Sequence, residues 1–390
     1  MKKTISILGS TGSVGQTSLK IISKKKKLFD VNLLYANKNF KLICHQIKKY
    51  NPKIFVINDL KILERVKKKF KNKKIIFTNF IKKKSINNSD ITISAIPGIA
   101  GLNPTLMMIK KSKKILIANK ESVICGWNLI SKEANKSGVE IVPIDSEHFS
   151  IMKLVENTNL DDVKKIYLTA SGGPFFNYKV TQLKKVKPKD AIKHPKWKMG
   201  KKISVDSANL MNKILELLEA HKLFNIPQNK LDILIHPNSL VHAIVVLKNG
   251  LTKFIYHDTS MVIPIANAIF ADQLNIADFY NLKKNKKKSI MENLSFYEVN
   301  QENYPMIKLK EKIFEFPSSP IIINAANEVL VDHFLRKKIA FLSIYKIILG
   351  ILRDRNYRKY AIRKPNKINQ INDIDNWSRK KTLEIINSKK

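Results

Sequence analysis

The sequence has few cysteines and no long apolar run. Its 390 residues include two cysteines, Cys44 and Cys125, which do not form a C-x-x-C pair. This excludes a disulfide framework and a cysteine-based zinc site, and we expect both side chains to be buried. No stretch of about 18 uncharged apolar residues is present to span a membrane. Met1-Lys2-Lys3 leads directly into an apolar segment without a signal-peptide pattern. We therefore expect a soluble, cytoplasmic protein with no membrane partner.

Acidic residues are scarce beside basic ones. The chain has 72 Lys and Arg residues against 31 Asp and Glu residues, a formal net charge of +41. Such a charge is compatible with nucleic-acid binding. However, the lysines recur in short runs along the whole chain, without interleaved aromatic residues, as on solvated surfaces. We therefore predict no specific nucleic-acid partner and keep a basic nucleic-acid-binding protein as a minor alternative. The runs lie at residues 24–27, 67–69, 82–84, 184–189 and 286–288.

The pattern of apolar segments predicts an α/β protein of several domains. A hydrophobic content of 44% over 390 residues is enough for a large core. We predict a Rossmann-like, doubly wound parallel sheet in residues 1–145, a middle α+β domain in 146–278, a linker in 279–303 and a C-terminal helical domain in 304–390. Parallel sheets of this kind bind ligands at the carboxyl ends of their strands. The predicted strands of the first domain are Thr4–Leu8, Val31–Ala36, Ile54–Ile57, Lys74–Phe77, Ile91–Ile96, Lys114–Ala118 and Val139–Ile144.

A glycine-rich loop follows the first predicted strand. The run Gly9-Ser10-Thr11-Gly12-Ser13-Val14-Gly15 precedes a helix predicted from about Gln16. Its G-x-x-G-x-x-G spacing is less common than G-x-G-x-x-G, but its place between strand and helix favours dinucleotide binding over an ordinary glycine turn. The second strand ends in Ala36-Asn37-Lys38-Asn39, without the acidic residue typical of an NAD site. The lysine therefore favours the 2′-phosphate of NADP.

Polar loops also follow the fifth and sixth predicted strands. The fifth strand leads into Pro97-Gly98-Ile99-Ala100-Gly101, and the sixth into Asn119-Lys120-Glu121-Ser122. A polar cluster directly after a buried strand is more often used for binding than for packing. We therefore expect both loops to belong to the dinucleotide crevice.

Two carboxylates follow the last strand of this domain. In an extended chain, Asp145 and Glu147 point to the same side, with the Ser146 hydroxyl beside them. Hard oxygen ligands at the end of a strand suit Mg²⁺ or Mn²⁺ rather than zinc. The alternative is that Asp145 caps a helix beginning near His148, with Glu147 in its first turn. The local sequence favours neither interpretation.

Three segments of the middle domain are candidates for binding an anionic substrate. The loop Ser171-Gly172-Gly173-Pro174 follows a predicted strand and could hold an anion or be a plain turn. The stretch His194-Pro195-Lys196-Trp197-Lys198-Met199-Gly200 is a possible lid or an exposed loop with a packed tryptophan. A helix predicted over Ser207–Leu223 presents Asn212, Lys213 and Glu216 opposite its apolar stripe, either to a metal-bound phosphorylated substrate or simply to solvent.

The rest of the middle domain predicts a sheet, and the end of the chain predicts helices. Strands are expected at Ile233–Pro237, Val241–Leu247 and Phe254–Tyr256, with a hairpin at Asn249-Gly250. An antiparallel sheet with one free face is a plausible dimer surface. In the C-terminal domain, Asn324–Glu328 is expected to open a helix.

Taken together, these segments resemble the 1-deoxy-D-xylulose 5-phosphate reductoisomerase family over nearly the whole chain. The resemblance implies a metal site of Asp145, Glu147 and Glu216. It implies that Glu147, Lys213, His194 and Trp197 take part in catalysis and that Ser146, Ser171, His194, Ser207, Asn212, Lys213 and His242 bind substrate. It also implies an NADPH site formed by Gly9, Ser10, Thr11, Gly12, Ser13, Val14, Asn37, Lys38, Asn39, Asn119, Lys120, Glu121, Met199, Gly200 and Met261.

The same resemblance implies a reaction. It is the rearrangement of 1-deoxy-D-xylulose 5-phosphate and its reduction by NADPH to 2-C-methyl-D-erythritol 4-phosphate, in isoprenoid precursor synthesis. The expected metal is Mg²⁺ or Mn²⁺, with Co²⁺ a further option, and the expected assembly is a homodimer through the middle domain. Glu147 or a metal-ordered water would move the protons. An NADP-dependent dehydrogenase of another small phosphorylated substrate is the main alternative. The chain departs from the family pattern at Asn37, Lys196, Lys198 and Ile214.

Overall fold

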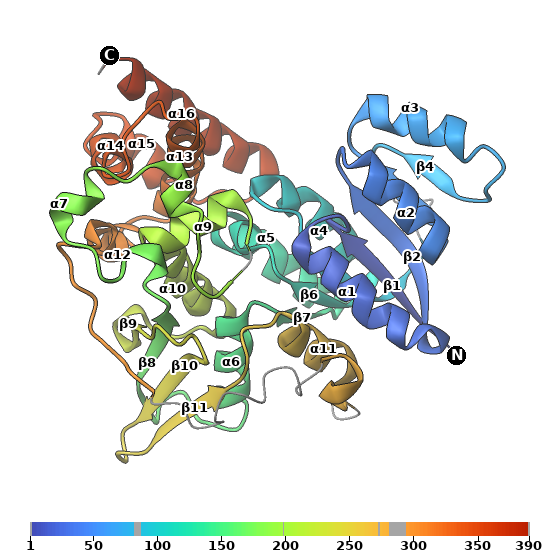
Figure 1. The fold of residues 1–390 in the computed structure, drawn as a ribbon, viewed down its shortest axis with the longest axis horizontal. Helices are drawn as coiled ribbons and strands as arrows, with labels where there is room; N and C mark the ends of the chain where they lie inside the picture. The colour runs from blue at the N-terminus through green and yellow to red at the C-terminus, as the bar shows by residue number, and fades with distance from the viewer. Residues whose placement is uncertain (1, 82–86, 198, 272–273, 281–293, 389–390) are drawn as a thin grey trace. The chain divides into compact units, whose positions relative to one another are not determined.

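The chain forms two compact units (Figure 1). The computed structural model describes residues 2–81, 87–197, 199–271, 274–280 and 294–388. The first unit comprises residues 1–122, 126–149 and 260–289, and the second comprises 123–125, 150–259 and 290–390. The predicted three-domain boundaries stay a prediction. The lysine runs at 82–84 and 286–288, Lys198 and most of the predicted linker lie outside the described residues.

The first unit contains the predicted doubly wound parallel sheet. Its strand order is β4-β3-β2-β1-β5-β6-β7, and every neighbouring pair is parallel. The order reverses between β1 and β5, where an open sheet of this kind binds its ligand. The fold class predicted from the apolar pattern is therefore confirmed for this unit. The strands are β1 (Lys3–Leu8), β2 (Phe29–Ala36), β3 (Ile54–Ile57), β4 (Ile76–Thr78), β5 (Ser89–Ser94), β6 (Ser112–Ile117) and β7 (Glu140–Pro143).

Side-chain caps define where several helices of this unit begin. Asn39, Asp59 and Asn119 each accept a hydrogen bond from a first-turn amide of the helix that follows. Such a cap is worth about 1 kcal/mol and fixes the residue at which a strand-end loop becomes helix. The helices are α1 (Ser13–Lys24), α2 (Phe40–Tyr50), α3 (Leu60–Lys69), α4 (Leu102–Ile109), α5 (Lys120–Ser137) and α11 (Val262–Phe270). Both cysteines are buried, as expected.

The second unit is built on a four-stranded sheet of order β11-β10-β8-β9. The predicted antiparallel sheet is in fact mixed, because β10 pairs with β8 and β11 in antiparallel but β9 pairs with β8 in parallel. The predicted hairpin is present, since β10 and β11 are antiparallel neighbours. Apolar residues of β8, β9 and β10 form one core with Leu210, Leu217 and Ala220. The strands are β8 (Val163–Ala170), β9 (Leu231–Ile235), β10 (Val241–Leu247) and β11 (Thr252–Tyr256).

The helix predicted over residues 207–223 is in fact two helices. Helix α9 (Lys201–Ala208) ends and α10 (Met211–Phe224) begins around Leu210, whose φ of +65° is left-handed. The Asn209 side chain accepts a hydrogen bond from the Met211 amide at 2.9 Å, which offers the backbone an alternative to continued helix. The apolar stripe continues across the break because Leu210 stays buried. Periodicity alone therefore did not reveal the interruption.

The C-terminal part of the second unit is helical, as predicted. Helix α13 packs against α16 and α14. The stretch Asn324–Glu328 lies inside α13 and does not open it, because the helix already begins at Ser319, before Pro320. None of the helices in the described part of the chain is long and apolar enough to cross a membrane. The helices are α12 (Leu309–Lys312), α13 (Ser319–Leu335), α14 (Ser343–Leu352), α15 (Tyr357–Ala361) and α16 (Ile368–Asn387).

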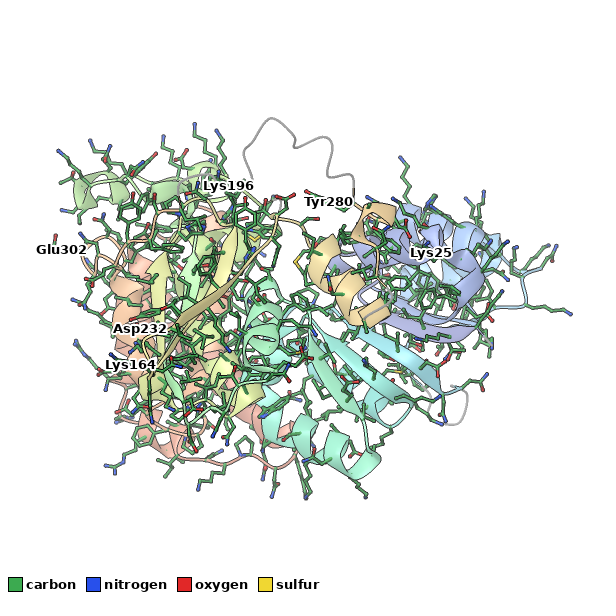
Figure 2. The ribbon with its side chains drawn as sticks, turned by 90° about the horizontal axis from the view of Figure 1, so that it is seen from below. Lys25, Lys164, Lys196, Asp232, Tyr280 and Glu302 are labelled. Carbon is green, nitrogen blue, oxygen red and sulfur yellow. The ribbon has the colours of Figure 1, made fainter. Side chains whose placement is uncertain are left out.

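The positive charge is distributed over the surface of both units. Figure 2 shows Lys25, Lys164 and Lys196 on different parts of the chain. Many lysines pair with a neighbouring acid, as Lys25 does with Asp278 at 2.6 Å. Exposed pairs of this kind contribute little to stability, typically about 0–1 kcal/mol.

Candidate functional site

The glycine-rich loop makes a tight turn between β1 and α1. Gly9 has a φ of +85°, and a Cβ atom there would lie 2.5 Å from the Ala95 carbonyl oxygen. The Gly9 and Ser10 amides donate to the Tyr35 carbonyl oxygen at 3.0 and 2.8 Å. Helix α1 then begins at Ser13, so its first-turn amides, which lack partners within the helix, directly follow the loop. This local structure can bind a pyrophosphate.

The end of β2 is exposed and basic. Asn37, Lys38 and Asn39 are all exposed, and Asn39 also caps α2. The Arg65 guanidinium on α3 lies 4.2 Å from the centre of the Phe40 ring, close to this end of the strand. Arg65 was not among the residues predicted from sequence, because it follows a different strand. Two cations near one strand end suit a phosphate group better than a ribose hydroxyl.

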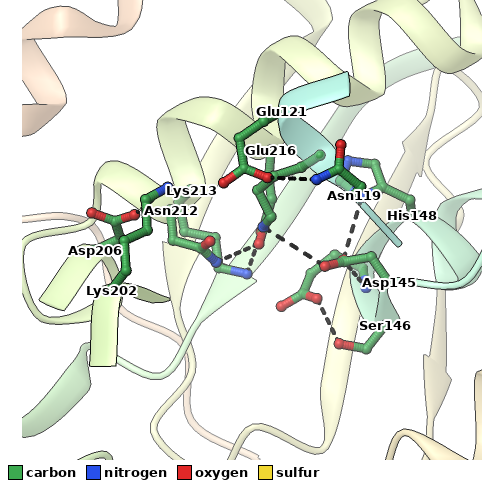
Figure 3. A network of polar contacts seen from close by, with 12 residues as sticks. Asn119, Glu121, Asp145, Ser146, His148, Lys202, Asp206, Asn212, Lys213 and Glu216 are labelled. Carbon is green, nitrogen blue, oxygen red and sulfur yellow. Dashed lines mark hydrogen bonds and ion pairs between the residues drawn. The ribbon is translucent and has the colours of Figure 1, made fainter. Parts of the chain in front are cut away.

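Asn119 connects the two loops that were predicted to share a crevice. Its side-chain amide donates to the carbonyl oxygens of Ile96 and, at 3.1 Å, of Gly98, which belong to the loop after β5. It also donates to Glu121 at 3.2 Å (Figure 3). Its carbonyl oxygen accepts from the Ser122 amide at 2.7 Å. One buried side chain therefore holds the loops after β5 and β6 together.

The acidic segment after β7 is ordered by a set of short-range polar contacts. One Asp145 carboxylate oxygen accepts from the Glu147 amide at 3.1 Å and lies 3.3 Å from His148 Nδ1. The other lies 3.7 Å from the Lys120 ammonium. The Ser146 hydroxyl donates to Glu147 Oε2 at 2.6 Å (Figure 3). Both carboxylates are partly exposed.

Helix α6 (Ser146–Val155) begins earlier than predicted. Its first residue is Ser146 rather than a residue near His148, so the argument from an extended chain does not apply to Asp145 and Glu147. The capping interpretation is correct for Asp145, because its side chain accepts a first-turn amide. Capping uses one oxygen of this carboxylate, so the same residue can both cap a helix and bind a metal ion.

In the second unit, Ser171 and His194 form a hydrogen-bonded pair. Ser171 Oγ lies 2.9 Å from His194 Nε2 and accepts from the Gly173 amide at 3.0 Å. His194 Nδ1 accepts from the Lys196 and Trp197 amides at 3.2 and 2.9 Å. A nitrogen that accepts carries no proton, so Nε2 carries it and donates to the serine. Because Ser171 Oγ accepts from two donors, its own proton is available to an anion.

Three aromatic side chains lie next to one another beyond this pair. The Trp197 and His242 rings are 6.1 Å apart in an edge-on arrangement, and the His242 and His257 rings are stacked at 4.0 Å. His242 is 2% exposed and His257 is 8% exposed. Trp197 is therefore packed on one side against a buried histidine, and not simply exposed.

The polar face of α10 is buried, although a solvated face was one interpretation of its sequence. Lys213 is 6% exposed and Glu216 is 1% exposed. The Lys213 ammonium donates to Glu216 Oε2 at 2.5 Å, and the Asn212 amide donates to Glu216 Oε1 (Figure 3). Burial of a lysine and a glutamate is costly unless they are paired, and here each is the other's partner.

Asp206 lies near this helix in sequence but has a structural environment. It is 1% exposed, accepts from Asn327 Nδ2 at 2.8 Å and pairs with Lys202 at 3.0 Å. Its charge is thus compensated within the protein. Ser207, which follows it on α9, is only partly buried.

Comparison with known proteins identifies the family. The model for 1-deoxy-D-xylulose 5-phosphate reductoisomerase matches residues 5–126, and two models for C-terminal domains of that enzyme match residues 141–224 and 258–381. The chain is 42% identical to the 1-deoxy-D-xylulose 5-phosphate reductoisomerase of Pelagibacter ubique (strain HTCC1062), with 96% of this chain and 97% of that protein covered. The chain belongs to the 1-deoxy-D-xylulose 5-phosphate reductoisomerase family.

Solved structures of reductoisomerases have the same fold. The enzyme from Zymomonas mobilis in complex with NADPH matches with a TM-score of 0.85 and 32% identity, over 99% of both chains. A reductoisomerase in complex with NADPH, fosmidomycin and magnesium matches with a TM-score of 0.90 and 29% identity, over 99% of this chain and 98% of the other. The family resemblance and the fold class predicted from sequence are both confirmed.

Some of the reductoisomerase residues predicted from sequence already have partners inside the protein. The Ser10 hydroxyl is buried and donates to Gln46 Oε1 at 2.8 Å, so its contribution to the glycine loop is structural. Thr11, Gly12, Ser13 and Val14 are at least partly exposed and remain accessible to a ligand. Met199, Gly200 and Met261 are also partly or fully exposed. The roles of individual residues stay predictions.

Proposed function

We propose that this chain catalyses the reaction of its family, the isomerisation of 1-deoxy-D-xylulose 5-phosphate and its NADPH-dependent reduction to 2-C-methyl-D-erythritol 4-phosphate. One observation carries the proposal for the site: Asp145, Glu147 and Glu216 each offer a carboxylate oxygen, and these oxygens lie within 4.8 Å of one another. Three carboxylates at that distance repel one another; the Lys213 and Lys120 ammonium groups compensate part of their charge, and a divalent cation would compensate the rest. A dehydrogenase acting on another phosphorylated substrate would not need this cluster.

The donor set fits a hard divalent ion. All three groups are carboxylates, with no cysteine and no histidine in the cluster, which suits Mg²⁺ or Mn²⁺ better than zinc. Co²⁺ is a further option. When bound, such an ion supplies Lewis-acid stabilisation of the substrate's carbonyl and hydroxyl oxygens. The Ser146 hydroxyl, which donates to Glu147, would touch the same part of the substrate.

The chain's own residues would bind and orient the phosphorylated ketose. Ser171 has a proton to donate to the phosphate, and Ser207, Asn212 and Lys213 add further donors. Lys213 also brings a positive charge that stabilises an alkoxide as it develops. Glu147 is the first candidate for moving a proton, because its carboxylate is partly exposed. Trp197, packed on His242, would cover the substrate and exclude water.

NADPH would bind along the carboxyl edge of the parallel sheet. The glycine loop and the start of α1 would hold the pyrophosphate. Lys38, with Arg65 nearby, would hold the 2′-phosphate. The loops after β5 and β6, joined by Asn119, would face the nicotinamide half. The cofactor supplies the hydride, and the remaining contacts are those proposed for Met199, Gly200 and Met261.

The assembly and the location are also part of the proposal. We infer a homodimer through the second unit, supported by the exposed strand β11, whose Phe254 is 48% exposed. Light scattering of the purified protein tests this. A cytoplasmic location stays a prediction, to be checked by cell fractionation.

A single assay tests the reaction. NADPH oxidation is followed with 1-deoxy-D-xylulose 5-phosphate, with Mg²⁺ or Mn²⁺ and after chelation. We expect turnover only with metal, and near-complete loss of it in Asp145→Ala, Glu147→Ala and Glu216→Ala. Asp206→Asn is the matched control, because that acid is buried but outside the proposed site. If Glu216→Ala keeps metal-dependent activity close to that of the wild type, the three-carboxylate site is wrong and Asp145 is only a helix cap.

A further inference from the structure

One buried tyrosine connects the C-terminal part of the second unit to the loop Ser171-Gly172-Gly173. Tyr304 is 3% exposed, and its hydroxyl donates to the Gly172 carbonyl oxygen at 2.7 Å. Burial raises the pKa of Tyr304, so the phenol remains a hydrogen-bond donor at neutral pH. Its ring belongs to the core formed by β8, β9 and β10. The hydroxyl is therefore held rigidly beneath the loop.

The loop needs such an anchor because it contains two glycines in left-handed conformations. Gly172 has a φ of +78° and Gly173 a φ of +63°. A Cβ atom on Gly173 would lie 2.9 Å from the Ala208 Cα atom, so a larger residue is excluded. Glycine makes this close approach to α9 feasible, but it leaves the backbone free to adopt other conformations. Hydrogen bonds must therefore select the observed one.

We propose that Tyr304 is a positioning residue of the substrate site. By fixing the Gly172 peptide, its hydroxyl holds the Gly173 amide in contact with Ser171 Oγ. With His194 donating to the same oxygen, the serine proton is directed outward, toward the substrate phosphate. Tyr304 touches no substrate and acts through Ser171. This inference rests on the proposed function, since it assigns the phosphate to Ser171.

The test compares Tyr304→Phe with a matched control, Tyr357→Phe. Tyr357 is also buried, and its hydroxyl bonds Ser319 Oγ at 2.7 Å, but it lies in α15. Each change deletes one buried hydroxyl that makes a hydrogen bond, so the melting temperatures of the two variants should fall by similar amounts. Only Tyr304→Phe should raise the KM for 1-deoxy-D-xylulose 5-phosphate and the Kd for inorganic phosphate, by about tenfold. The KM for NADPH should not change.

A double variant shows whether Tyr304 acts through Ser171. In a Ser171→Ala background, adding Tyr304→Phe should weaken phosphate binding by much less than tenfold. Equal phosphate affinities in the two phenylalanine variants would overturn the proposal, as would full additivity with Ser171→Ala. So would a Tyr304→Phe protein that does not fold, because a positioning hydroxyl leaves the fold intact. If the wild-type enzyme fails to turn over its substrate, the proposed function fails, and the phosphate affinities still decide the role of Tyr304.

Discussion

The buried pair of Lys213 and Glu216 makes the metal-free protein sensitive to one substitution. The ammonium and the carboxylate are 2.5 Å apart, and their side chains are 7% and 1% exposed. At an effective dielectric constant of about 20, two charges at this distance attract by roughly 6–7 kcal/mol, of which desolvation cancels a large part. Lys213→Met removes the ammonium and leaves the carboxylate buried. We expect the free energy of unfolding to fall by about 3–5 kcal/mol.

Urea unfolding in the presence of a chelator measures this loss. The double variant Lys213→Met/Glu216→Leu should regain most of it, because a buried pair replaced by apolar residues costs little. Adding Mg²⁺ should stabilise Lys213→Met more than the wild type, since the Glu216 carboxylate, which has lost the Lys213 ammonium, gains another cation. Lys153→Met is the control, because Lys153 and Glu156 form a pair in which both side chains are exposed, 39% and 53%, so removing the lysine should cost less. A Lys213→Met protein within about 1 kcal/mol of the wild type would refute this reasoning.

Four further outcomes are expected. Because Lys38 stands where an NAD site has an acid, kcat/KM should be higher with NADPH than with NADH. Equal kcat/KM values with the two cofactors would contradict the role of Lys38 in binding the 2′-phosphate. Burial lowers the pKa of Lys222 from 10.5 to about 8. Between these two pH values the unfolded chain binds more protons than the folded chain, so the free energy of unfolding should rise with pH. Urea titrations should show a rise of at most about 3 kcal/mol, and this rise should be absent in Lys222→Met. Trp197→Ala should lose kcat/KM with little change in melting temperature, whereas ordinary activity with reduced stability would make the tryptophan core packing. DNA affinity measured by filter binding should collapse as salt rises, and tight sequence-selective binding at physiological salt would contradict the diffuse-charge interpretation.

The parts of the fold that were predicted correctly depend on local patterns. The apolar runs of the first unit marked its seven strands, with boundary errors of a few residues, because a strand buried on both faces reads as a continuous apolar segment. The glycine loop was recognisable because Gly9 must adopt a positive φ beside Ala95. The lack of an acidic residue directly after the second strand, which favours NADP over NAD, could also be read from a few neighbouring residues.

The errors occurred where two local interpretations compete. The stripe through Leu210 predicted an unbroken helix, but Asn209 bonds the Met211 amide and Leu210 turns left-handed. Similarly, the start of α6 at Ser146 was missed because a carboxylate that caps a helix also looks like a metal ligand. Local sequence could not choose between these outcomes, since packing against the rest of the unit decides them.

By itself the sequence determined the fold class, the family and the list of residues that could carry the chemistry. Only the tertiary structure decided what each acid and hydroxyl contacts. Asp206 and Glu216 are close in the sequence, yet Asp206 bonds Asn327 from α13, whereas Glu216 bonds Lys213 in its own helix. Tyr304 reaches Gly172 across 132 residues of chain. The contacts of Tyr304 with Gly172 and of Asp206 with Asn327 leave no periodic or local signal, because they arise only when the packed core brings distant segments together.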